Sequence, residues 1–146
     1  MRTEIAFWDT SAIIPLCVFQ GATPAARRIH IDLPTKIIWW GTVVEVRSSF
    51  ARLKKAGELN ESNFEIAAAK WQGIANRSRI VPPTSRLLEI ASELPEDYGI
   101  RSLDAFQLAA ALVWCSERPR NRPFVCADKR LGDAAGDAGF DVVSLL

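Results

Sequence analysis

The sequence has few of the residues that build disulfide scaffolds, zinc sites or histidine-based catalysis. It contains three cysteines, Cys17, Cys115 and Cys126, and a single histidine, His30. Widely spaced cysteines in an odd number fit neither a disulfide framework nor a zinc-ligand motif. One histidine leaves no histidine pair to work as acid and base. We therefore expect reduced, mostly buried thiols, and any catalytic site must be made from other residue types.

Excess charge and long apolar runs are also missing. The chain has 18 basic and 17 acidic residues and a formal net charge of +1. No overall field therefore draws in nucleic acid, and a polyanion would have to be bound by local patches or by metal ions. No run approaches the roughly 18 apolar residues of a membrane-spanning helix. Asp9 and Pro15 interrupt the N-terminal segment where a signal peptide would be apolar, so we expect a cytoplasmic protein.

Short apolar runs alternate with segments of helical period. Strands are expected at residues 4–8, 36–40, 79–81, 123–127 and 140–144. Helices are expected from residue 10 or 11 onward and at residues 24–29, 42–56, 61–75, 85–94, 102–115 and 131–138. This alternation predicts one domain over residues 1–146 with an α/β fold: three α/β/α layers around a mostly parallel central sheet. The helices that start at residues 42 and 61 are predicted to form an antiparallel pair.

Two local features lead to further expectations. Pro95 should stop the helix that begins at Ser85, because proline has no backbone N–H to donate. Trp39 and Trp40 are adjacent in a predicted strand and so should face opposite sides of the sheet. We expect both to be covered, which is typical of a central parallel strand with helices on each face.

Four acidic residues fall where a parallel sheet would collect them. Asp9 follows the first strand, and Asp128 follows the strand at residues 123–127. Glu45 lies in the first turn of the helix after the second strand, and Asp104 in the first turn of an apolar, alanine-rich helix. Ligands of open parallel sheets bind beyond the carboxyl ends of the strands. Asp104 would join the other three if its helix points its N-terminus to the same edge.

Each acid also has a simpler interpretation. Asp9 could cap a helix, Asp104 could be a first-turn acid favoured by the helix dipole, and Asp128 could be a turn residue. Glu45 is harder to explain in this way, because it lies beside an apolar stripe. Carboxylates that converge repel one another, and a hard divalent cation such as Mg²⁺ or Mn²⁺ would offset that repulsion.

Four segments together resemble the ordered motifs of PIN-domain ribonucleases, and of the VapC-type toxins of bacterial toxin–antitoxin pairs in particular. They are FWDTSA (residues 7–12), VEV (residues 44–46), RSLDAFQLAAA (residues 101–111) and ADKRL (residues 127–131). The resemblance spans essentially the whole chain. The third segment is the most distinctive, and the signal is the order and spacing of all four.

The resemblance implies a metal-dependent endoribonuclease with a PIN-like fold. Asp9, Glu45, Asp104 and Asp128 would form its acidic site and hold Mg²⁺ or Mn²⁺. Asp9 and Asp104 would be direct metal ligands, and Glu45 and Asp128 would bind directly or through water. The implied partners are an RNA substrate, a small antitoxin protein and a second copy of the chain in a homodimer.

Neighbouring residues receive supporting roles from the same resemblance. Thr10 or Ser11 would hydrogen-bond a carboxylate or a water molecule. Similar proteins usually carry Thr or Ser two residues before the fourth acid, where this chain has Cys126. A thiol is a weaker hydrogen-bond donor than a hydroxyl, so the departure concerns how well Asp128 or its water is oriented and not the core of the site. Cys126 could also be just a small apolar strand residue.

Three basic residues lie close to the acids in sequence. Arg101 could offset the carboxylates or meet an RNA phosphate, and it could equally be a surface arginine. Lys129 and Arg130 follow Asp128 and could contact the RNA backbone.

Several alternatives remain at this point. A PIN fold could act only as a binding module, or as a non-toxin nuclease in RNA processing. A receiver domain would need an acidic pair after the first strand, and an aspartate-nucleophile phosphatase would need an acid at the position of Ser11. Asp9 stands alone in that segment, which disfavours both.

Overall fold

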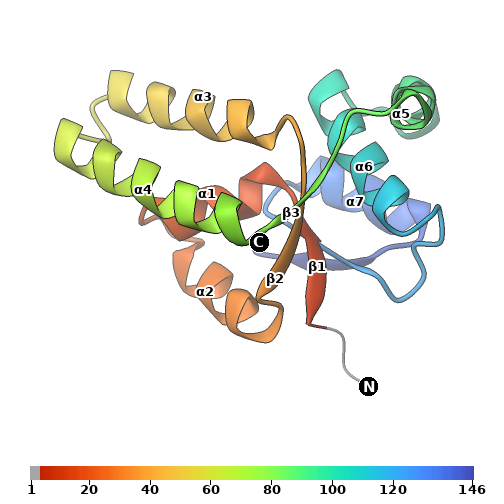
Figure 1. The fold of residues 1–146 in the computed structure, drawn as a ribbon, viewed down its shortest axis with the longest axis horizontal. Coiled ribbons are helices and arrows are strands. Elements are labelled where there is room, and N and C mark those ends of the chain that lie inside the picture. Colours follow the sequence, from red (N-terminus) through yellow and green to blue (C-terminus); the bar gives the residue numbers. More distant parts are fainter. Residues whose placement is uncertain (1–3) are drawn as a thin grey trace.

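Five parallel strands form the centre of the computed structural model, which describes residues 4–146 (Figure 1). They are β1 (Ile5–Trp8), β2 (Thr35–Trp39), β3 (Arg79–Val81), β4 (Pro123–Cys126) and β5 (Asp141–Ser144). Their order across the sheet is β3-β2-β1-β4-β5, and each neighbouring pair is parallel. The predicted parallel sheet is therefore confirmed, with β1 at its centre.

Helices cover both faces of this sheet. One face carries α1 (Thr10–Cys17), α2 (Thr23–Asp32), α3 (Thr42–Lys55) and α4 (Glu61–Arg77), and the other carries α5 (Ser85–Tyr98), α6 (Ser102–Trp114) and α7 (Lys129–Ala138). Successive strand residues point to opposite faces. Trp8 and Ile38 accordingly belong to the core under α1–α4, and Phe7 and Ile37 to the core under α5–α7. The three-layer prediction is confirmed.

The pair α3 and α4 also has the predicted antiparallel arrangement, and Figure 1 shows the two helices running side by side. Phe50 of α3 meets Phe64 of α4 edge to face, with 6.3 Å between ring centroids. Gly57, in the turn after α3, has a φ of 77°. That left-handed conformation is readily adopted by glycine.

The prediction that Pro95 ends α5 is wrong. The helix continues to Tyr98, and Gly99, with a φ of 67°, caps it by donating its N–H to the Pro95 carbonyl. Proline removes one hydrogen bond from the helix. Leu94 is 5% exposed and packs with α6 in the core under α5–α7, so burial holds the last turn in place.

The prediction that both tryptophans of the second strand are covered is wrong for Trp40. Strand β2 ends at Trp39, which is 7% exposed and stacks on Phe106 of α6 at 5.5 Å between ring centroids. Trp40 follows the strand and is 58% exposed. It therefore presents a large apolar side chain to solvent at the carboxyl end of β2.

The three cysteines are free and buried, as expected. Burial raises the pKa of the Cys17 thiol to about 12 and that of Cys126 to about 11. Within residues 4–146, none of the helices has the length and apolar character needed to cross a membrane.

Candidate functional site

Asp9 lies at the junction of β1 and α1 and is 4% exposed. It is the N-cap of α1, because its Oδ2 accepts a hydrogen bond from the Ser11 backbone nitrogen at 3.2 Å and another from the Ser11 hydroxyl. The Ser11 hydroxyl in turn accepts from the backbone nitrogen of Ala127 at 2.8 Å. Ser11 thus fixes the Asp9 carboxyl and ties it to the end of β4. The capping interpretation of Asp9 is correct as geometry, and both of these bonds use the same carboxyl oxygen.

Burial raises the pKa of Asp9 to about 7. The hydrogen bond from the Ser11 hydroxyl acts against this rise, whereas the charges of Glu45 and Asp104 add to it. A buried carboxyl with nearby like charges is poorly stabilised as an anion. Asp9 therefore retains a proton more readily than an ordinary aspartate unless a cation joins it.

Glu45 is held in place by Gln107, which is 0% exposed. The amide nitrogen of Gln107 lies 3.0 Å from Glu45 Oε2, 3.0 Å from Thr10 Oγ1 and 3.1 Å from Thr42 Oγ1. An amide has two N–H donors, so it serves two of these three acceptors at once. Burial raises the pKa of Glu45 even though Gln107 and Thr10 hydrogen-bond to its charged form, and the charge of Asp104 raises it further.

Gln107 is the functional residue that the sequence analysis missed. A signal for it exists in the sequence, since it is an amide in the middle of a buried, alanine-rich helix and comes three residues after Asp104. A spacing of three places both side chains on one side of the helix. Buried polar side chains are normally hydrogen-bonded, so an amide at this position predicts hydrogen-bond partners from other segments.

Asp104 and Asp128 form the other side of the group of acids. Asp104 lies in the first turn of α6, and its pKa is raised by partial burial and then by the charge of Asp128. Arg130 lies close enough to lower it. Asp128 caps α7, because its Oδ1 accepts from the Leu131 backbone nitrogen at 2.9 Å. The expectation that Asp104 would join the acids at this edge agrees with these interactions.

Cys126 lies at the end of β4, fully buried, with its Sγ 3.7 Å from the Asp128 carbonyl oxygen. Burial keeps this thiol protonated at neutral pH. It therefore acts as a weak donor to the backbone of Asp128, where the family pattern would place a hydroxyl.

The three basic residues named from the sequence differ in their surroundings. Lys129 is exposed and pairs with Asp133 one turn along α7, at 3.0 Å between Nζ and Oδ2. Arg101 is exposed and makes no side-chain hydrogen bond as the N-cap of α6. Arg130 is the one whose charge reaches an acid of the site, Asp104.

The four predicted acids thus lie around one edge of the sheet and are linked by their charges. The charges of Glu45 and Asp104 raise the pKa of Asp9, and the charge of Asp104 also raises the pKa of Glu45. The charge of Asp128 raises the pKa of Asp104. In the part of the chain that the structure describes, no three metal-ligating side chains are already gathered around one point. The donor set still fits a hard divalent cation, because Mg²⁺ and Mn²⁺ prefer carboxylate oxygens and would offset this repulsion.

An apolar groove adjoins the acids. Its cavity of about 540 Å³ is bordered by Glu45. Large apolar side chains stand exposed along it: Trp40, Val44, Leu88 and Leu103 are each 58% to 69% exposed. Contiguous apolar side chains on a surface are typical of sites that bind another molecule.

Comparison with known proteins identifies the family and a protein of similar structure. A family model described as PIN domain matches residues 6–136. Among solved structures, the crystal structure of PAE2754 from Pyrobaculum aerophilum is similar to this one, with a TM-score of 0.60. Its sequence identity is 16% over 99% of this chain and 93% of that chain, a level that shows the shared fold. The comparison with curated proteins gave no match.

Proposed function

The chain belongs to the PIN domain family, whose members are generally nucleases, and we propose that it is a Mg²⁺- or Mn²⁺-dependent endoribonuclease. The observation that carries this proposal is the group formed by the buried Asp9 and the half-buried Glu45 and Asp104, whose charges repel. Burying like charges costs free energy unless something compensates them. Such an arrangement is expected where a cation is bound for function.

Asp9 and Asp104 are the best candidates for direct metal ligands, and Glu45 and Asp128 would bind directly or through water. The two hydrogen bonds of Asp9 with Ser11 use Oδ2, which leaves Oδ1 to face a cation. A bound divalent ion would lower the pKa of a water molecule and neutralise charge on the phosphate that is attacked.

The chain's own residues would orient this site. Ser11 holds the Asp9 carboxyl, and Gln107 holds Glu45 against α6. Arg130 supplies a positive charge that lowers the pKa of Asp104, and it would also meet a phosphate of the RNA. Positioning of this kind contributes to rate because reacting groups need not be ordered during the reaction.

The direct test is cleavage of a synthetic single-stranded RNA by the purified chain with Mn²⁺ or Mg²⁺. We expect cleavage that stops with a chelator and is lost in Asp9→Ala. Asp97→Ala is the matched control, because Asp97 is an exposed aspartate on α5, and it should cleave like the wild type. Cleavage that persists in Asp9→Ala would show that the acids are not the site. Absence of cleavage by the wild type would favour a PIN fold that only binds.

We further propose that the chain is the toxin of a toxin–antitoxin pair and forms a homodimer. The groove beside Glu45, with Trp40 and Leu103 exposed, supports a protein partner that lies across the site. Co-purification with the product of a small adjacent reading frame that has a DNA-binding N-terminus tests the toxin assignment. Without such a partner, a nuclease of RNA processing becomes the better assignment.

A further inference from the structure

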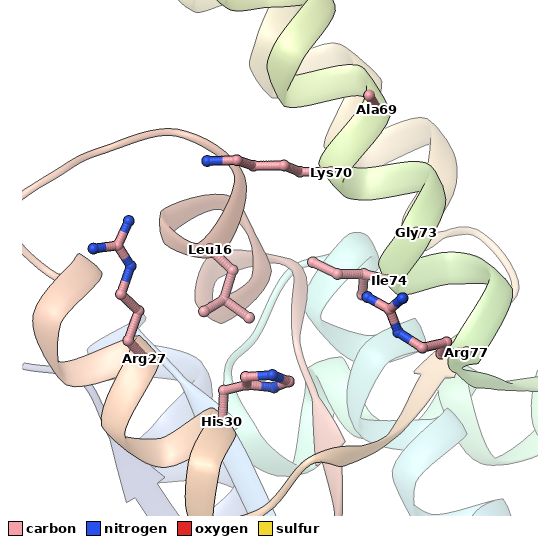
Figure 2. A pocket seen from close by; sticks show the side chains of 8 residues that line it. All are labelled: Leu16, Arg27, His30, Ala69, Lys70, Gly73, Ile74 and Arg77. Carbon is pink, nitrogen blue, oxygen red and sulfur yellow. The ribbon is translucent and has the colours of Figure 1, made fainter.

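A second cavity lies between α1, α2 and α4, away from the acids. Its volume is about 490 Å³, and Figure 2 shows the side chains that line it. Arg27 and His30 come from α2, Leu16 from α1, and Lys70 and Arg77 from α4. In the figure, Arg27 lies on the left and Arg77 on the right, with Leu16 and His30 between them, and Lys70 extends from α4 across the top, above Leu16.

This cavity is positively charged. Its lining contains no aspartate or glutamate. Among the ion pairs formed within residues 4–146, none involves Arg27, Lys70 or Arg77. Exposed cations on helices commonly pair with a carboxylate three or four residues away. Here three cations from two helices line one cavity, and none of them pairs with a carboxylate of residues 4–146.

A buried lysine contacts His30 of this lining. Lys36 in β2 is 3% exposed, and its Nζ lies 2.6 Å from His30 Nδ1 and 4.5 Å from the centroid of the Trp8 ring. An ammonium group only donates, so Nδ1 of His30 accepts and the imidazole proton lies on Nε2. His30 therefore offers an N–H donor while remaining neutral.

Burial and a neighbouring cation disfavour the charged form of Lys36. Burial and then the charge of Arg77 lower the pKa of Lys36 to about 8. The pKa of His30 is lowered by burial and then by Lys36 and Arg77. Arg77 and Lys36 are both cations and repel each other. An anion bound in the cavity would relieve this repulsion.

The remaining lining is apolar. Leu16, Ala69 and Ile74 form the surface between the cations. A cavity of this size falls within the range of small-molecule sites, which combine an apolar lining with a few polar groups. Two arginines favour a phosphate over a simple halide, because the planar guanidinium donates two parallel hydrogen bonds to phosphate oxygens.

We propose that this cavity binds a small organic phosphate of nucleotide size, with its phosphate on Arg27, Lys70 and Arg77 and its ring against Leu16 and Ile74. The site is separate from the acids. Lys36 is the second residue of β2 and Arg77 precedes β3, so the cavity lies at the amino edge of the sheet. The acids lie at the opposite edge, where Asp9 and Asp128 follow the carboxyl ends of β1 and β4. This binding does not depend on nuclease activity.

Isothermal titration of the full chain, with a chelator present, tests the proposal. The probes are adenosine 5′-monophosphate, inorganic phosphate and adenosine. We expect the monophosphate to bind at least tenfold more tightly than inorganic phosphate, and adenosine to bind much more weakly than either. The double variant Arg27→Gln/Arg77→Gln should weaken binding of the monophosphate at least tenfold. Arg28→Gln, an exposed neighbour on α2 that does not line the cavity, should leave it unchanged.

Three results would overturn the proposal. One is equal binding of the monophosphate by wild type and by the double variant. Another is equal binding of inorganic phosphate and the monophosphate, which would leave the apolar lining without a role. The third is binding of a single-stranded RNA oligomer, but not of the monophosphate, that is lost in the double variant. Asp9→Ala should bind the monophosphate like wild type, so this test and the test of nuclease activity can fail independently.

Discussion

The amide nitrogen of Gln107 lies 3.0 Å from the Glu45 carboxylate, although 62 residues separate them in the chain. The same nitrogen reaches the hydroxyls of Thr10 and Thr42, so one buried amide connects α6 with the starts of α1 and α3. Asp9 caps α1, Glu45 lies in the first turn of α3, and Asp104 lies in the first turn of α6. Gln107 therefore fixes how Asp9 and Glu45 lie relative to Asp104.

Replacing Gln107 with leucine should affect both stability and the pH profile. It leaves Glu45 and two threonine hydroxyls without their donor, which should lower the free energy of unfolding by about 1–3 kcal/mol. It also removes a hydrogen bond that lowers the pKa of Glu45, so the acidic limb of the cleavage profile should move to higher pH. Gln72→Leu is the control, because Gln72 is exposed on α4 and bonds only within that helix, to Asn76. An unchanged pH profile in Gln107→Leu would contradict the positioning role.

Without metal, the stability of the chain should fall as pH rises from about 4 to about 7. The pKa of Asp9 is 3.8 in its ordinary state and about 7 when folded. The folded state thus keeps a proton that the unfolded state has lost in this window, and this contribution is full below the lower value and lost above the higher one. The loss amounts to at most about 4 kcal/mol.

Urea unfolding with a chelator at about pH 5 and about pH 8 measures this slope. The free energy of unfolding of Asp9→Asn should change less between these two pH values than that of wild type. Asp97→Asn should show the same change as wild type. Millimolar Mn²⁺ should raise the stability of the wild type at the higher pH, because the ion binds the native state. The same slope in Asp9→Asn and wild type would show that Asp9 is not the group responsible.

The cysteines should resist alkylation in the folded protein. The reactive species is the thiolate, and burial raises the pKa values of Cys17 and Cys126 to about 12 and about 11. Iodoacetamide at mildly alkaline pH should therefore modify them rapidly only after urea is added. Mass spectrometry of the two samples provides the comparison. Fast labelling of Cys126 in the native chain would mean that the end of β4 is open to solvent.

Gly99→Ala should destabilise the chain by about 1–2 kcal/mol, because Gly99 adopts a left-handed conformation that costs this much for other residues. Its φ is 67°, and it ends α5 just before Arg101 and α6. Gly21→Ala is the matched control, since a Cβ there meets nothing within 4 Å and its φ is ordinary. Thermal unfolding of both variants gives the comparison, and equal melting temperatures would contradict the capping role.

Much of the fold could be predicted from local patterns. Asp9 after an apolar run, Gly57 after an amphipathic stretch and the alternation of strands and helices each have a local physical cause. The extension of α5 beyond Pro95 could not be predicted in this way, because it depends on packing of Leu94 in the core shared with α6. The exposure of Trp40 likewise depends on where β2 ends in the folded sheet.

The candidate site was only partly visible in the sequence. Strand ends and the family resemblance indicated the four acids, but the bonds that hold them come from distant segments. Gln107 stands out only when its burial among Thr10, Thr42 and Glu45 is seen. The basic cavity was still harder to predict from the sequence, because its cations come from separate helices and a strand and share no motif.

The central claim is that these acids form a metal-dependent site that cuts RNA. Mapping of RNA ends in total cellular RNA, after induction of wild type and of Asp104→Asn, tests it most directly. The account predicts a set of new RNA ends with the wild type that is absent with Asp104→Asn, at matched protein levels. The same new ends with both proteins would contradict it.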